Sequence, residues 1–185
     1  MSAQDSKLFV ISGPSGAGKG TLRERRSNLG LTVSATTRAP RKGEVDGVNY
    51  FFLTREEFDR RVANGEFVEW AEVHGNCYGT LVSEVTSKLA SGASLILEID
   101  VQGALQVKER FPEAVLIFIK PPSLEVLRER LVGRGTETPE TIELRMANAA
   151  DELALADRYD DVVVNDDLDR ATDELVRVLD MHERI

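Results

Sequence analysis

Residues 7–19 read KLFVISGPSGAGK, and this stretch decides the fold. The apolar run from Lys7 to Ser12 is typical of a buried strand. It is followed directly by Gly13-Pro-Ser-Gly-Ala-Gly18-Lys19, which matches the G-x-x-x-x-G-K pattern of a Walker A loop, or P-loop. We predict that a helix begins at Lys19. A strand, a glycine-rich loop, a lysine and a helix in this order predict a site for nucleotide phosphates.

Each part of this loop has a chemical reason. Glycines allow backbone N–H groups to turn toward phosphate oxygens, and the N-terminus of a helix favours negative charge. Lys19 adds a positive charge for the β- and γ-phosphates. We predict that the triphosphate is bound by Gly13, Pro14, Ser15, Gly16, Ala17, Gly18, Lys19, Gly20 and Thr21. Gly20 stands where the motif has a hydroxyl ligand for Mg²⁺, so no metal ligand is assigned and Thr21 is kept only as a candidate.

Apolar strands and helices alternate along most of the remaining chain. We predict buried strands over 94–99, 114–120 and 161–164, and helices over 83–90, 101–110, 123–132, 138–157 and 168–184. This alternation predicts an α/β fold whose parallel sheet is covered by helices on both faces. Residues 33–82 interrupt it with predicted strands over 49–53 and 67–73 and a helix that a capping box at Thr54 opens. We interpret this stretch as an insertion on the α/β core.

Charge is distributed unevenly along the 185 residues, whose net charge is −9. Residues 1–42 carry eight Lys or Arg and two Asp or Glu, for +6, and the remainder carries −15. An acidic protein is a poor candidate for binding nucleic acid, so the basic stretch around the loop indicates a local pocket for a small anion. A solvated basic surface is the alternative.

Apolar runs and cysteines bear on the compartment. No run approaches the roughly 20 residues that span a bilayer, and residues 1–6 do not resemble a signal peptide, so we expect no membrane partner. Cys77 is the single cysteine, which excludes an intrachain disulfide and favours a reducing, cytoplasmic location.

Motifs beyond the P-loop run through the insertion and the second half of the chain. They are Ser34-Ala-Thr-Thr-Arg38-Ala-Pro-Arg41, Gly43-Glu-Val-Asp-Gly47, Tyr50-Phe-Phe, Glu69-Trp-Ala-Glu-Val-His-Gly75, Asn76-Cys-Tyr78-Gly-Thr80, Leu97-Glu-Ile-Asp100, Gly133-Arg-Gly-Thr136 and Val164-Asn-Asp-Asp167. In this order and spacing, the chain closely resembles the guanylate kinases over essentially its whole length.

The resemblance implies a P-loop NTPase three-layer fold with a parallel sheet, an inserted mixed α+β subdomain that binds the nucleoside monophosphate, and a small helical lid. The core would comprise residues 1–32, 83–125 and 156–185, the GMP-binding insertion 33–82 and the lid region 126–155, in one domain. The implied reaction of purine metabolism is ATP + GMP giving ADP + GDP, with Mg²⁺ accompanying ATP. Use of dGMP, and a monomer or a homodimer, both remain open.

The resemblance also implies roles for individual residues. GMP would be held by Ser34, Arg38, Arg41, Tyr50, Glu69, Tyr78, Thr80 and Asp100. Arg130, Arg134 and Asn165 would join the P-loop around ATP, and the catalytic groups would be Lys19, Arg38, Asp100, Arg134 and Arg145. The chemistry fits, because a carboxylate at Glu69 can accept from N1–H and the 2-amino group of guanine, which adenine cannot match. A hydroxyl at Thr80 can donate to O6.

The segment after the P-loop is unusually polar. Leu22 is the one large apolar residue from Lys19 to Asn28, whereas a helix on a parallel sheet needs an apolar stripe. Compared with the family, the segment is shorter by about one helical turn. We expect either a truncated helix or a chain from which a few residues are omitted.

Two other functions fit parts of the same pattern. Guanylate-kinase-like binding modules of scaffold proteins have lost catalysis, but their P-loops are degraded, whereas Lys19 and its glycines are kept here. A kinase for another phosphorylated acceptor would not need Glu69 and Thr80.

Overall fold

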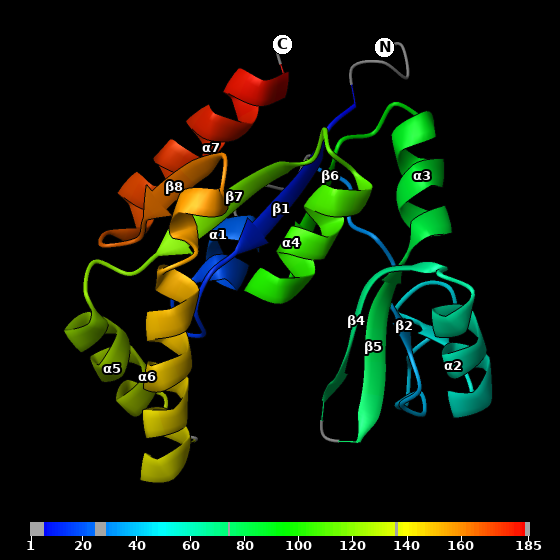
Figure 1. Ribbon diagram of the computed structural model, residues 1–185, viewed down its shortest axis with the longest axis horizontal. Helices are drawn as coiled ribbons and strands as arrows, with labels where there is room; N and C mark the ends of the chain where they lie inside the picture. Colours follow the sequence, from blue (N-terminus) through cyan, green and yellow to red (C-terminus); the bar gives the residue numbers. More distant parts are fainter. Residues whose placement is uncertain (1–5, 25–28, 74, 136, 184–185) are drawn as a thin grey trace.

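Figure 1 shows the computed structural model, which describes residues 6–24, 29–73, 75–135 and 137–183. Its core is a four-stranded sheet in the order β6-β1-β7-β8, with every neighbouring pair parallel. The strands are β1 (Leu8–Ser12), β6 (Leu95–Glu98), β7 (Val115–Lys120) and β8 (Asp161–Val164). The predicted parallel sheet is therefore confirmed.

Side chains of the central strands alternate between two hydrophobic cores. Leu8 and Val10 of β1 belong to one core, and Phe9 and Ile11 belong to the other. The first core lies under α3 (Val82–Ala90) and α4 (Val101–Arg110), and the second lies under α1 (Lys19–Glu24) and α7 (Leu168–Glu183). Because successive residues of a strand point to opposite faces, an all-apolar strand requires this cover on both sides. The three-layer arrangement is confirmed.

Helix α1 begins at Lys19, as predicted. It has six residues, and Leu22 is fully buried in the core that α7 completes. The rest of the unusually polar segment, residues 25–28, lies outside the described residues, so the alternatives of a truncated helix and omitted residues are not tested. The chain then rejoins the sheet, where Gly30 donates to the backbone oxygen of Ser94 beside β6.

The insertion folds around a second sheet with the order β3-β2-β5-β4. Its elements are β2 (Ala35–Thr36), β3 (Phe51–Phe52), α2 (Arg55–Ala63), β4 (Phe67–Val73) and β5 (Asn76–Leu81). The rings of Phe58 and Phe67 stack at a centroid distance of 4.4 Å in a small core of its own. The insertion is thus mixed α+β, as expected.

Several predicted boundaries in the insertion are wrong. The strand predicted over 49–53 contains only two residues, and strands β2 and β5 were not predicted. Strand β5 lacks an apolar alternation and contains Gly79, where a Cβ atom would lie 2.7 Å from Cδ1 of Phe67. The start of α2 was predicted correctly, since Oγ1 of Thr54 accepts a hydrogen bond from N–H of Glu57.

Helices α5 (Leu124–Gly133) and α6 (Pro139–Leu153) form the predicted lid region. Leu127 and Leu131 pack with Ile142 and Ala149 in a separate small core. The prediction that the second helix continues to Asp157 is wrong, because α6 ends at Leu153 and a 3₁₀ turn (Ala156–Arg158) follows. Leu155 and Ala156 pack against the main core there, which requires the chain to turn toward β8.

Figure 1 shows the insertion and the lid extending from the core on either side of α4 in this view. Across the described ranges, no helix combines the length and the apolar character needed to cross a bilayer.

Candidate active site

The P-loop joins β1 to α1, and close contacts require two of its glycines. Gly13 has φ of 145°, and a Cβ atom there would lie 2.3 Å from the backbone oxygen of Ile119. A Cβ atom on Gly18 would lie 2.3 Å from Nδ2 of Asn165. Gly18 also has φ of 93°, so a side chain at either position would strain the loop.

Lys19 is folded onto its own loop. Its Nζ donates to the backbone oxygens of Gly13 at 2.5 Å and Pro14 at 3.1 Å. Burial lowers the pKa of the ammonium, while the nearby carboxylates of Glu98, Glu152 and Asp100 oppose that shift and Arg134 adds to it. The predicted catalytic residues Asp100 and Arg134 therefore act electrostatically on the P-loop lysine.

Asn165 braces the P-loop from the end of β8. Its buried side-chain nitrogen donates to the backbone oxygen of Ala17 at 2.8 Å. Arg130 of α5 donates in turn to the backbone oxygen of Asn165 at 2.8 Å. Of these two predicted ATP-binding residues, Asn165 contacts the loop directly and Arg130 contacts Asn165, whose amide nitrogen already has a partner.

Arg145 brings the lid to the same loop. Its Nη1 donates to Oγ of Ser15, which joins α6 to a residue 130 positions earlier in the chain. The predicted lid arginine therefore reaches the P-loop. Arg134 is exposed at the C-terminal end of α5.

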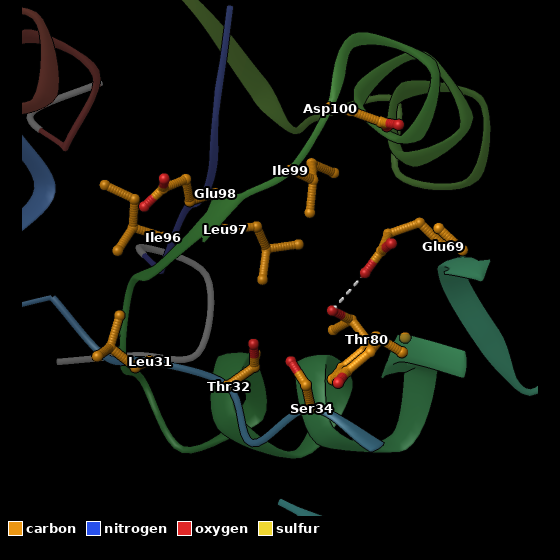
Figure 2. Close-up of a pocket in the computed structure, with 13 residues that line it drawn as sticks. Leu31, Thr32, Ser34, Glu69, Thr80, Ile96, Leu97, Glu98, Ile99 and Asp100 are labelled. Carbon is orange, nitrogen blue, oxygen red and sulfur yellow. Dashed lines mark hydrogen bonds between the residues drawn. The ribbon is translucent and has the colours of Figure 1, made fainter. Parts of the chain in front are cut away.

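A cavity of about 390 Å³ lies between the core and the insertion. Its walls come from residues 31–34, strands β4 and β5, and residues 96–100. Five predicted acceptor-site residues line it: Ser34, Glu69, Tyr78, Thr80 and Asp100. Figure 2 shows that Thr32 also presents its hydroxyl here, although no sequence motif singled it out.

The side chains of Glu69 and Thr80 form a hydrogen bond between the neighbouring strands β4 and β5. Oγ1 of Thr80 donates to Oε1 of Glu69 at 2.7 Å, the dashed contact in Figure 2. Burial raises the pKa of the Glu69 carboxyl, Thr80 opposes the shift, and the negative charge of Asp100 adds to it. The hydroxyl expected to donate to O6 of guanine therefore donates to the carboxylate in the free protein, so it would have to exchange partners on binding.

Asp100 has a structural role that sequence reasoning missed. Its Oδ1 accepts from N–H of Gly103 at 2.7 Å, which makes it the N-cap of α4. An Asp directly before an apolar helical stretch was the available signal. The cap fixes the carboxylate at the edge of the cavity.

Arg38, Arg41 and Tyr50 lie on the insertion, outside the cavity wall. Arg38 forms a bidentate pair with Glu44, at 2.9 Å from Nη2 to Oε1 and 3.0 Å from Nη1 to Oε2. Hydrogen bonding to Glu44 is the largest cause that raises the pKa of the Arg38 guanidinium, and Tyr78 contributes less. The guanidinium carbon lies 5.4 Å from the Tyr50 ring centroid.

Glu44 also organises the turn that carries both arginines. Its Oε2 accepts from the backbone N–H of Arg41 at 2.7 Å. The sequence motif contains this carboxylate, but sequence reasoning gave it no role. Charges of opposite sign three and six residues apart within one turn were the only signal.

Oxygen donors beside the P-loop suit a magnesium ion. At Gly20, a Cβ atom would lie 3.6 Å from Oε1 of Glu98, so a carboxylate faces the position where the motif has a hydroxyl. Within the described ranges, no group of three or more His, Cys, Asp or Glu is arranged as a metal site. Mg²⁺ is usually bound by one or two carboxylates together with nucleotide phosphates and water, and the Glu98 carboxylate is a ligand of this kind.

Comparison with known proteins places this arrangement in a family. A family model described as guanylate kinase matches residues 5–182. The chain is 52% identical to a guanylate kinase of Halalkalibacterium halodurans, over 97% of this chain and 90% of that protein. It is 56% identical to one of Gloeobacter violaceus, over 94% of this chain and 87% of that protein.

A solved structure supports the same assignment. The crystal structure of guanylate kinase from Anaplasma phagocytophilum matches with a TM-score of 0.70 and 38% identity, over 96% of this chain and 86% of that one. The chain therefore belongs to the guanylate kinase family.

Proposed function

We propose that this member of the guanylate kinase family transfers the γ-phosphoryl group of ATP to GMP between the P-loop and the cavity beside β6. The family shows that the protein is a kinase. The geometry supports separate sites for the phosphoryl donor and the phosphoryl acceptor. The donor would lie on the loop that Asn165 braces, and the acceptor base would lie against Glu69.

On the donor side, the P-loop from Gly13 to Thr21 would hold the triphosphate. Lys19 would leave the backbone oxygens of Gly13 and Pro14 for the β- and γ-phosphates, which offer it full charges. Arg134 and Arg145 would add positive charge from the lid, and Arg130 and Asn165 would keep the loop in place. Mg²⁺ would neutralise phosphate charge, with oxygens of Glu98, Asp100 or Thr21 as candidate ligands.

On the acceptor side, residues of the insertion would bind both the base and the phosphate of GMP. Glu69 would accept from N1–H and the 2-amino group of guanine, and the hydroxyls of Ser34 and Thr80 would lie beside the base. Arg38, Arg41, Tyr50 and Tyr78 would bind the phosphate. Arg38 is already oriented by Glu44, so little side-chain freedom is lost on binding.

The reaction would be a direct in-line transfer. Phosphoryl transfer depends on positioning and charge neutralisation, so no phosphoenzyme is needed. Asp100 is fixed at the junction of the two sites and would help to orient the acceptor. Lys19 and the lid arginines would stabilise charge that develops on the transferred oxygens.

We propose the same three parts as moving units: the insertion 33–82, the lid 126–155 and the core. Separate hydrophobic clusters in the insertion and the lid support this division. Closure of the lid would exclude water, which would otherwise accept the phosphoryl group. A cytoplasmic location in purine metabolism fits the buried free thiol of Cys77.

One observation carries the proposal: a half-buried carboxylate, Glu69, accepts a hydrogen bond from Thr80 in a cavity at the edge of the parallel sheet that carries the P-loop. The test measures ADP formation from ATP and Mg²⁺ with GMP, dGMP, AMP, CMP or UMP as acceptor. We expect turnover with guanine nucleotides and little with the others. Equal turnover with AMP would refute the base-reading role of Glu69, and no turnover in folded protein would favour a binding module.

A further inference from the structure

We infer that Glu137 is a positioning residue that holds Arg145 in the orientation in which it reaches the P-loop. The inference rests on the proposed role of Arg145 in phosphoryl transfer. No sequence motif gave Glu137 a role, and it does not contact the P-loop through any described bond. It would act only through the arginine.

The contact is a single ion pair between two parts of the lid. Nε of Arg145 lies 2.9 Å from Oε2 of Glu137, and this buried oxygen has no hydrogen-bond partner among the described residues, so the contact is electrostatic. Glu137 directly precedes the N-cap Thr138 of α6, and Arg145 lies two turns further along that helix. While Nε lies close to Glu137, Nη1 donates to Oγ of Ser15. The two ends of one guanidinium therefore join the lid carboxylate to the P-loop.

The two side chains of this ion pair differ in their exposure to solvent. The Glu137 side chain is 8% exposed, whereas that of Arg145 is 37% exposed. The carboxylate therefore has little access to water, whereas the arginine side chain is partly open to solvent. A buried charge needs its partner, so Glu137 draws the long arginine side chain back to the lid surface. Ordering that side chain before the reaction removes an entropy cost from the step in which it acts.

Another pair in the lid lacks these properties. Arg128 and Glu143 join α5 to α6, with side chains 48% and 63% exposed. Neither contacts the P-loop in any described bond, and an exposed pair of this kind contributes little to stability. Glu143 is therefore a matched control, since it is a glutamate of the same lid, paired with an arginine, without a link to Ser15.

The test compares Glu137→Gln with Glu143→Gln. Glutamine keeps the size of the side chain and removes its charge. We expect Glu137→Gln to lower kcat about tenfold, with KM for GMP changed less than twofold, because a misplaced group costs rate rather than acceptor binding. Glu143→Gln should leave kcat within twofold. Thermal unfolding of each variant shows whether the lid remains folded, and Glu137→Asp, which keeps the charge, should retain more activity than Glu137→Gln.

A double-mutant cycle with Arg145→Ala separates positioning from general destabilisation. If Glu137 acts through Arg145, Glu137→Gln has no further effect on kcat in the Arg145→Ala background. An equal loss of kcat in both backgrounds would overturn the inference, because the effect would then be structural. If Arg145→Ala lowers kcat but Glu137→Gln does not, the inference fails while the proposed site stands. If Arg145→Ala itself leaves kcat unchanged, the proposed role of Arg145 fails and the inference fails with it.

Discussion

The two sheets of this protein form their sites by different means. The parallel sheet is apolar on both faces, and at its carboxyl edge the backbone of a glycine loop forms the proposed donor site. The insertion sheet has short strands and a small core, and the cavity beside it, the proposed acceptor site, is lined by side chains such as Glu69 and Thr80. A backbone site suits a phosphate group that all nucleotides share, and a side-chain site suits the selection of one base. The predictions below separate the two.

The largest effect is expected at the donor site. Lys19→Ala removes the one P-loop side chain that carries a charge toward the β- and γ-phosphates, so we predict a loss of kcat of about a thousandfold or more. Steady-state ADP formation measures it. Lys7→Ala, at the other end of β1, is the control and should retain full activity. Near-normal turnover of Lys19→Ala would refute the P-loop assignment.

A second large effect is expected in the insertion core. Phe58 is fully buried and stacks on Phe67, so Phe58→Ala should lower the free energy of unfolding by about 3 kcal/mol. Urea denaturation measures the change, and Val48→Ala at an exposed position of the same insertion should cost less than about 0.5 kcal/mol. Affinity for GMP should fall while that for ATP is kept. Equal loss of both affinities would show that the two sheets do not act as separate units.

The next effect concerns base selection. Glu69→Gln offers guanine an amide that presents a donor as well as an acceptor, so we predict a fall in kcat/KM for GMP of about a hundredfold and a smaller preference over AMP. Glu72→Gln is the matched control, since Glu72 lies on the same strand with its side chain exposed and paired with Arg55. An unchanged ratio between GMP and AMP would remove Glu69 from the base-reading site.

The smallest expected effect is a dependence on pH. Burial raises the pKa of Glu69 above its ordinary value of 4.5, so the carboxylate is lost at a higher pH than for an exposed glutamate. We predict that kcat/KM for GMP falls as the pH is lowered through this raised pKa, and that Glu69→Gln lacks this acidic limb. The effect on folding has the opposite sign. Because the folded protein binds the proton more tightly, Glu69 favours folding more as the pH falls between the raised and the ordinary value.

The sequence predicted the parallel sheet well because its signals are local. The strand and loop of residues 7–19 predict their own structure, and Asp161 to Val164 forms β8 as predicted. The insertion was harder to predict, because β5 is defined by pairing with β4 and its Gly79 is explained only by the neighbouring Phe67. Long-range pairing of this kind leaves little periodicity in the sequence.

The site shows the same limit. Sequence motifs singled out Glu69, Thr80 and Lys19 as candidate site residues. Only the structure shows which of the candidate residues lie close to one another. The carboxylates that hold Arg38 and Arg145 were missed, because Glu44 and Glu137 act across turns whose geometry the sequence does not specify. The hydroxyl of Thr80 was expected to donate to O6 of guanine, whereas in this structure it donates to Glu69.

Binding of each substrate alone tests the central claim most directly. Isothermal titration would measure the affinity of GMP and of a non-hydrolysable ATP analogue for the wild type, Glu69→Gln and Lys19→Ala. We predict that Glu69→Gln weakens GMP at least tenfold and leaves the ATP analogue within twofold, and that Lys19→Ala does the reverse. If either variant weakens both ligands equally, the separation between a backbone donor site and a side-chain acceptor site is wrong.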